Sequence, residues 1–212
     1  MDVMNLFYFA GLSMVLTFMP GPDILFVITQ SITGNWKDGM VVAIGLCTGL
    51  VVHTMAAALG VSAILHHSSL AFQTLKIAGA VYLFYLAWQA LREAGSSHDA
   101  DGSGRTVGSQ SLLGLYQKGI LMNLLNPKVS LFFLAFLPQF ISPGSTSVHL
   151  QMVILGLIFI LQAVLVFSVV SLIAHRLGRI FMKNATVSRW VNRGKAGIYV
   201  ALGAKLFMMD NK

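Results

Sequence analysis

The segment Met19–Asp23 (MPGPD) combines residue types that are unusual inside an apolar stretch. Pro20 and Pro22 each remove a backbone donor and clash with the preceding turn, and Gly21 loosens the chain between them, so a helix is expected to break here. Asp23 sets a carboxylate directly after the break. At membrane depth a carboxylate costs about 2.5–3.5 kcal/mol, which favours a functional role. Capping of a helix that begins after Pro22 is the structural alternative, and the two roles are compatible.

The segment Asn123–Lys128 (NLLNPK) has the same character further along the chain. Pro127 frees a carbonyl one turn earlier, and Asn126 can bond loose backbone groups. Lys128 sets a cation near the centre of its apolar stretch. A lysine near a membrane surface would extend its ammonium into water, but the central position favours a functional site. We expect Asn123 and Asn126 to belong to the same site.

Asp23 and Lys128 have opposite charges, and each lies at a predicted helix break. If the two side chains meet, each lowers the cost of burying the other. A zwitterionic amino acid carries an ammonium and a carboxylate, so it can enter between them, with its carboxylate toward Lys128 and its ammonium toward Asp23. Protonation of Asp23 would release this arrangement, which gives a route for coupling to protons. The charges therefore predict a site for a small zwitterion.

His53 lies in the middle of another apolar stretch, on one helical stripe with Gly45 and Gly49. The two glycines predict a close contact with a neighbouring helix. For His53 the sequence leaves two roles open. It can be a neutral histidine bonded to a neighbouring helix, or it can relay protons.

The composition of the chain is typical of a membrane protein. Of its 212 residues, 56% are hydrophobic and 10% are charged, whereas about 25% are charged in an ordinary globular domain. Uncharged runs reach the ~20 residues that a helix needs to cross a bilayer. We predict an all-α polytopic membrane protein with six transmembrane helices. They cover Asn5–Gln30, Gly39–Leu65, Leu70–Arg92, Leu115–Phe140, Leu150–His175 and Trp190–Met209.

A polar stretch rich in glycine, serine and aspartate divides the chain into two halves. Residues 93–113 cannot bury enough apolar surface to order themselves, so we predict a flexible linker there. Residues 1–92 and 114–212 then hold three helices each, and each half begins with a proline-broken helix. Three is an odd number of spans, so the halves are expected to be inverted repeats, the arrangement typical of secondary transporters.

Lysine and arginine are concentrated in the first, third and fifth connections, while the second and fourth contain neither. Basic connections stay in the cytoplasm, so we predict a cytoplasmic linker and both termini outside the cytoplasmic membrane. The net charge is +7, but the basic residues are scattered over separate connections. A nucleic-acid-binding protein would gather them on one face.

The sequence gives little support to other chemistry. One cysteine, Cys47, is too few for a disulfide within the chain. We recognise no phosphate-binding loop, nucleophile triad or metal-ligand cluster, so we expect no enzyme activity, no cofactor, no metal site and no ATP-driven pump. The expected partners are a small amino acid, protons and the lipid bilayer.

These motifs resemble those of the lysine exporter (LysE/RhtB) family, and of its homoserine/threonine branch in particular. The resemblance covers nearly the whole chain. Its segments are PGPDILFVITQS (Pro20–Ser31), GLCTGLVVH (Gly45–His53), KIAGAVYLFYLAWQALR (Lys76–Arg92) and GILMNLLNPKVSLFFLAFLPQF (Gly119–Phe140). The resemblance implies six spans, export of neutral or basic amino acids or homoserine lactones, and proton-driven antiport. It leaves a homodimer open and does not fix the substrate.

The sequence therefore favours a secondary transporter that exports homoserine, threonine or a similar amino acid by proton antiport. Two alternatives stay open. The first is an exporter of the same superfamily that carries another metabolite or a metal ion. A metal-ion exporter would need several intramembrane acids, and only Asp23 is available. A non-transporting assembly or signalling protein is the other, and the paired broken helices argue against it.

Overall fold

The computed structural model describes residues 2–61, 69–95, 111–142 and 147–181, and a few isolated positions between 197 and 208. Every regular element in these ranges is a helix, which confirms the all-α prediction. The α-helices are α1 (Val3–Phe18), α2 (Pro22–Thr33), α3 (Trp36–Ala56), α5 (Ser69–Gly95), α6 (Leu112–Leu124), α7 (Pro127–Leu131) and α8 (Val148–Phe181). The remaining helical turns are the π-helices η1 (Ala57–Val61) and η2 (Phe132–Phe136) and the 3₁₀-helix η3 (Leu137–Phe140).

Within these described ranges, two helices are long and apolar enough to cross a membrane, Trp36–Gly60 and Val148–Arg176. The number rises to four if each of two bent pairs is counted as one span. The first pair is α1 and α2, which meet at 58°, and the second runs from α6 through Pro127–Phe140 with a bend of 49°. The expected span Leu70–Arg92 lies within α5, while Trp190–Met209 falls almost entirely outside the described residues.

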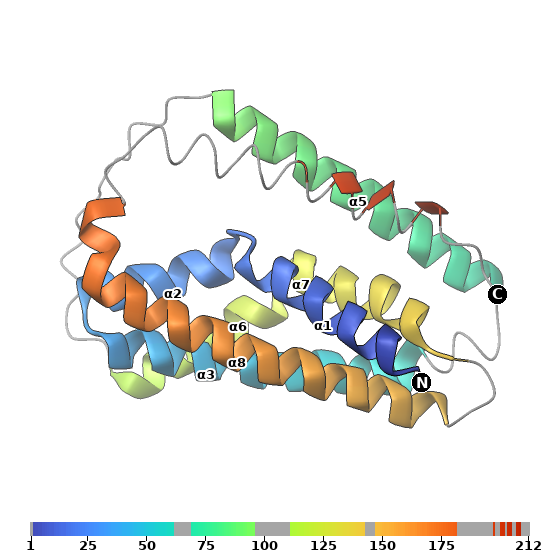
Figure 1. Cartoon of the computed structure of the whole chain (residues 1–212), viewed down its shortest axis with the longest axis horizontal. Coiled ribbons are helices and arrows are strands. Elements are labelled where there is room, and N and C mark those ends of the chain that lie inside the picture. Colours follow the sequence, from blue (N-terminus) through green and yellow to red (C-terminus); the bar gives the residue numbers. More distant parts are fainter. Residues whose placement is uncertain are drawn as a thin grey trace.

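The helices run lengthwise, so their ends gather at two opposite ends of the molecule (Figure 1). The α2–α3 turn, the first residues of α6 and the last of α8 lie at one end, and α5 runs toward that end but stops short of it. The first residues of α1, α5 and α8 lie at the other end, with η1 and η3. Among the described residues, the helix ends that border a predicted cytoplasmic connection therefore lie at the first of these two ends or, for α5, are directed toward it.

The predicted boundaries differ from the observed ones by two or three residues at several helix ends, and most clearly at the linker and in the fifth span. Helix α5 continues to Gly95 and α6 begins at Leu112, so helix covers the two edges of the segment predicted as linker. The rest of that segment, residues 96–110, lies outside the described residues. Helix α8 extends to Phe181, beyond the predicted end at His175, because its basic last residues continue the helix past the apolar run.

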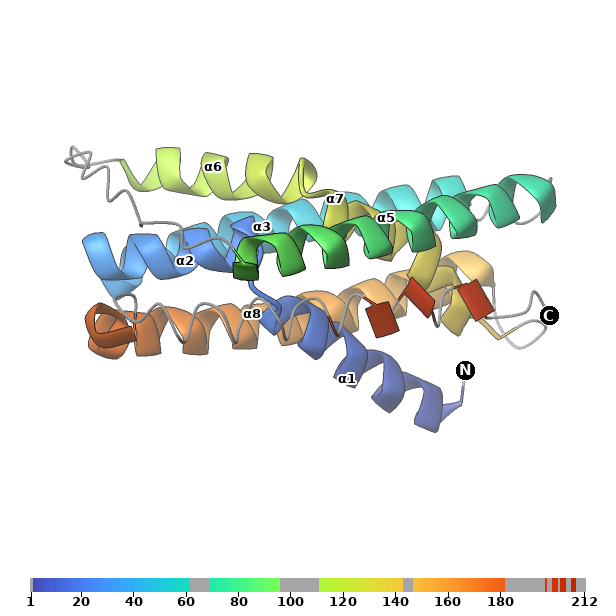
Figure 2. The same cartoon turned by 90° about the horizontal axis from the view of Figure 1, so that it is seen from above.

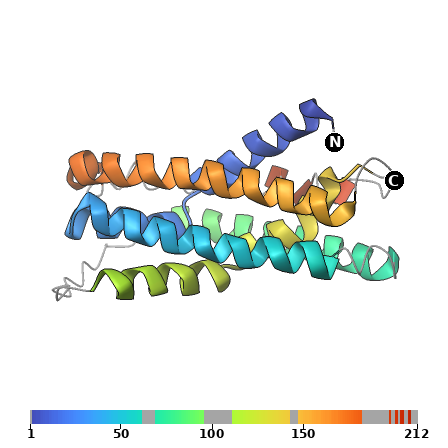
Figure 3. The ribbon, with the colours of Figure 1, turned by 90° about the horizontal axis from the view of Figure 1, so that it is seen from below.

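Helix α3 lies between α6 and α8 and packs against both (Figure 3). Its contact with α6 is made by glycines. A methyl group on Gly119 would lie 2.6 Å from the Val42 carbonyl oxygen, and one on Gly45 would overlap the carbonyl of Tyr116. The helix backbones therefore touch, as the glycine stripe predicts, and no larger residue fits at either position.

Helix α1 diverges from the other helices on the far side of the first break (Figure 2). Its Phe9 packs in an aromatic cluster with Phe132 and Phe140, at ring-centroid distances of 5.8 and 5.1 Å. On the opposite side of the breaks, Ser31 of α2 and Ser171 of α8 are joined by a hydrogen bond of 2.9 Å. The contacts on the two sides thus differ, since aromatic rings pack on one side and a hydroxyl–hydroxyl bond joins α2 to α8 on the other.

Candidate functional site

The first break separates α1 from α2. Pro20 has no N–H, so the Leu16 carbonyl loses the donor that a continuous helix would supply. Gly21 is the N-cap of α2, makes no side-chain capping bond, and is followed by Pro22 at the first helical position. The capping role considered for Asp23 is therefore wrong: Asp23 lies in the first turn of α2. There its carboxylate faces the favourable positive end of the helix dipole.

The second break separates α6 from α7 and follows the same pattern. Pro127 is the first residue of α7, and it leaves the Asn123 carbonyl without its usual donor four residues on. The Asn126 side chain caps the new helix, because its Oδ1 accepts a hydrogen bond of 3.1 Å from the backbone N–H of Lys128. Each expected break residue thus lies at the end of a helix rather than within one.

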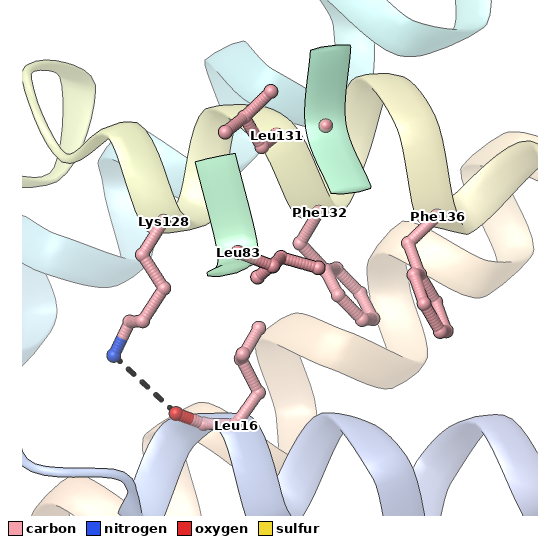
Figure 4. Close-up of a pocket in the computed structure, with 7 residues that line it drawn as sticks. Leu16, Leu83, Lys128, Leu131, Phe132 and Phe136 are labelled. Carbon is pink, nitrogen blue, oxygen red and sulfur yellow. Dashed lines mark hydrogen bonds between the residues drawn. The ribbon is translucent and has the colours of Figure 1, made fainter. Parts of the chain in front are cut away.

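The two breaks bring Asp23 and Lys128 into contact. The Lys128 Nζ lies 3.2 Å from Asp23 Oδ2, and the exposed fractions of the two side chains are 5% and 4%. The same ammonium donates to the Leu16 and Met19 carbonyl oxygens, at 3.3 Å each. Figure 4 shows Lys128 reaching from its helix to the Leu16 oxygen. Three acceptor groups match the three N–H bonds of an ammonium, so this buried cation is fully bonded.

Gly21 makes room for this ion pair. A methyl group at position 21 would lie 2.7 Å from Asp23 Oδ1 and 3.1 Å from Lys128 Nζ. The backbone of Gly21 is extended, with φ −135°, so any residue could adopt it. Glycine is therefore needed here for space rather than for conformational freedom.

His53 bonds a backbone carbonyl at the second break, as Lys128 does at the first. Its Nε2 lies 3.2 Å from the Asn123 carbonyl oxygen, which loses its i+4 donor to Pro127 and also accepts from the Asn126 N–H at 3.0 Å. Gly49, one turn earlier on α3, leaves space for the Asn123 amide, since a methyl group there would lie 2.6 Å from Oδ1. At both breaks, a side chain from one half of the chain thus bonds a carbonyl of the other half that has lost its i+4 donor to proline.

Several polar atoms near the breaks lack a hydrogen-bond partner within the described part of the chain. They are Asn123 Oδ1, Asn126 Nδ2 and Gln162 Oε1, all buried. The Gln162 Nε2 donates to Thr17 Oγ1 over 2.9 Å and ties α8 to α1. Neither Thr17 nor the Leu16 and Met19 carbonyls stood out in the sequence, although Leu16 lies four residues before Pro20.

Two narrow pockets adjoin the Lys128 side chain. One is lined by Leu16, Leu83, Phe132 and Phe136, among others (Figure 4). The other touches Thr17, Asp23 and Asn123 as well as Phe159. Each pocket has room for about one water molecule, so a larger molecule can enter only if the helices move apart. Among the described residues, no three His, Cys, Asp or Glu side chains gather closely enough to hold a metal ion.

A family model of LysE type translocators matches residues 14–210. The chain belongs to the LysE type translocator family. The resemblance drawn from the motifs is thereby confirmed. The family consists of efflux transporters for amino acids, so the chain is a membrane transporter and not an enzyme.

Curated relatives agree with this assignment. A homoserine/homoserine lactone efflux protein of Salmonella typhimurium is 32% identical over 194 residues, which cover 92% of this chain and 91% of the relative. An uncharacterized membrane protein of Pseudomonas aeruginosa is 30% identical, with 89% and 88% covered. A leucine efflux protein of Enterobacter is 28% identical over 73% of this chain and 72% of its own. No solved structure matches the chain.

The hydrogen bond from His53 to the second break can be tested by substitution. His53→Phe removes the donor but keeps a ring beside Phe133, which now lies 5.8 Å from the imidazole. Because such a bond contributes about 1 kcal/mol, the melting temperature of the purified protein should fall by about 2–4 °C. His53→Gln keeps a donor and should lose less. Equal melting temperatures for the two variants would show that the bond contributes nothing.

Proposed function

We propose that this chain exports homoserine, threonine or a similar small neutral amino acid across the cytoplasmic membrane by proton antiport. The observation that carries the proposal is the buried contact between Asp23 and Lys128, which joins two helix breaks at 3.2 Å. Charged side chains at membrane depth are costly, and they mark substrate or proton pathways. Broken helices that meet in the interior are the usual form of a substrate site in secondary transporters.

The pair offers both charges that an amino acid needs. The substrate carboxylate is placed toward Lys128, which lies in the first turn of α7, and its ammonium toward Asp23. Each ion then stays paired when the substrate replaces the lysine–aspartate contact, so no bare charge is left in the low-dielectric interior. The unpartnered Asn126 Nδ2 and Asn123 Oδ1 supply one donor and one acceptor beside the same site.

Asp23 is also our candidate for the coupling step. Protonation removes its negative charge, and with it the strongest attraction for the substrate ammonium. A proton that enters Asp23 from outside would therefore release the amino acid, and loss of that proton to the cytoplasm would reset the site. His53 is the second candidate, because it bonds the other break directly and an imidazole can take up and release a proton.

The two breaks also support the inverted-repeat arrangement that we propose for residues 1–92 and 114–212. In each half the first helix is bent at its proline, by 58° and 49° respectively. We further propose that the protein lies in the cytoplasmic membrane with residues 93–113 on the cytoplasmic side and both termini outside. A homodimer is compatible with this arrangement but is not required by the site.

The orientation can be tested by cysteine labelling in intact cells. In a Cys47→Ala background, Thr33→Cys marks the exposed end of α2 and Ser147→Cys the opposite end of the molecule. A membrane-impermeant maleimide should label position 147 in intact cells and position 33 only after the membrane is opened. The reverse pattern would overturn the proposed topology and leave the fold untouched.

Transport itself can be measured with the purified protein in proteoliposomes. Radiolabelled homoserine and threonine should exchange across the membrane, and an inward proton gradient should drive their net export. Asp23→Asn and Lys128→Met should each nearly abolish transport, since each removes a charged partner of the substrate and leaves the other charge buried and unpaired. Lys37→Gln, which changes an exposed lysine, serves as the control.

Three results would contradict the proposal in different ways. Transport of divalent metal ions but of no amino acid would favour the metal-ion alternative. Transport of amino acids without any response to the proton gradient would remove the antiport. Failure to transport homoserine, threonine or divalent metal ions would favour the non-transporting alternative, although the family consists of transporters.

A further inference from the structure

The oxygen atoms that hold the Lys128 ammonium all come from the first break. They are the Leu16 and Met19 carbonyl oxygens and the Asp23 carboxylate, at 3.2–3.3 Å from Nζ. We call these three groups the oxygen cradle. No part of it belongs to α7, from which Lys128 extends. The cradle is therefore built by residues 16–23 alone, and the lysine side chain reaches into it from the other half of the chain.

Local chemistry explains why this cradle attracts a cation. The Leu16 carbonyl has no helical donor because residue 20 is proline. Met19 has left the helical conformation, with φ −63° and ψ 118°, so its carbonyl also points out of the helix ladder. Both carbonyls lie at the carboxyl end of α1, where the helix dipole is negative. The Asp23 carboxylate adds a full negative charge. Without a cation, three buried acceptors would face one another.

The distances indicate which cations fit. Separations of 3.2–3.3 Å from nitrogen to oxygen suit an ammonium group that donates three hydrogen bonds. Hard metal ions require shorter contacts, about 2.3–2.6 Å for calcium, and they require more oxygen ligands than these three groups supply. The cradle thus matches a primary ammonium better than a metal ion.

We propose that the oxygen cradle is a binding site for free primary ammonium ions, which Lys128 occupies as a tethered cation. On the basis of the proposed function, the displacing ion in the transport cycle is the α-ammonium of the amino acid. The lysine has a flexible four-carbon stem, so it can leave the cradle and follow the substrate carboxylate. The cradle keeps one cation throughout, and Leu16, Met19 and Asp23 become substrate ligands.

In this arrangement Lys128 has two distinct roles, which a permanent ion pair with Asp23 would not allow. Lys128 holds the cradle closed between cycles, since a tethered group acts at a high effective concentration. Release of the lysine into the site then provides the positive charge for the substrate carboxylate. A molecule with a carboxylate but no ammonium cannot displace the lysine, and it should therefore not be transported.

The test is chemical rescue of Lys128→Ala. The substitution removes three methylene groups and the ammonium, and propylammonium has the same atoms. Propylammonium chloride should raise the melting temperature of purified Lys128→Ala in proportion to the logarithm of its concentration, and it should leave wild type unchanged. The controls are 1-propanol, which has the same shape without the charge, and sodium chloride. Lys37→Ala, which lacks an exposed lysine, should not respond.

The carboxylate provides the second control. In Lys128→Ala combined with Asp23→Asn, at least ten times more propylammonium should be needed for the same rise in melting temperature. If Lys128→Ala is too unstable to purify, its abundance in membranes of cells grown with propylammonium replaces the melting temperature, and it should rise several-fold. An equal effect of propanol or sodium, an undiminished response after Asp23→Asn, or no response at all would overturn the cradle.

These measurements do not depend on transport. Rescue by propylammonium in a protein that transports no amino acid would keep the cradle and refute the proposed substrate. Active transport without rescue would refute the cradle and leave the proposed function in place. In wild-type proteoliposomes, 4-hydroxybutyrate, which is homoserine without its ammonium, should fail to inhibit homoserine exchange.

Discussion

A lysine ammonium and an aspartate carboxylate meet in the interior of this protein, each almost completely removed from solvent. In an apolar medium neither ion is tolerable alone, and each therefore requires the other to be held in place. The helix breaks meet that requirement. Pro20 and Pro127 open the two helices, Gly21 leaves room beside the ions, and α3 is positioned by Gly45 and Gly119 so closely that His53 reaches the second break.

The same interaction explains how a membrane transporter can be stable and still move. At each break one carbonyl loses its i+4 donor to proline and is bonded by a side chain from the other half of the chain. Lys128 bonds the Leu16 carbonyl, and His53 bonds the Asn123 carbonyl. These contacts are polar, so a substrate or water can replace them without loss of paired groups. The apolar packing around them cannot be replaced by water in the same way, because the phenylalanines of η2 are buried. Opening is therefore expected along the polar contacts.

Much of this site could be predicted from the sequence because its signals are local. Proline, glycine and a charge inside an apolar run have few structural uses, and they identify Asp23, Lys128 and both breaks. The carbonyl ligands could not be found so directly, since backbone atoms of Leu16 and Met19 look like those of any residue. The π-helical turn at Phe132–Phe136 and the bond between Gln162 and Thr17 depend on packing between distant segments, which a single sequence does not reveal.

The central claim is that Asp23 and Lys128 form one site, and a double-mutant cycle tests it most directly. Membrane abundance is measured for wild type, Asp23→Asn, Lys128→Met and the double variant. Each single variant leaves a buried charge unpaired and should lose most of its abundance, while the double variant should recover it without regaining export. If the two losses instead add, so that the double variant is the least abundant of the four, then the residues act independently and the shared site is contradicted.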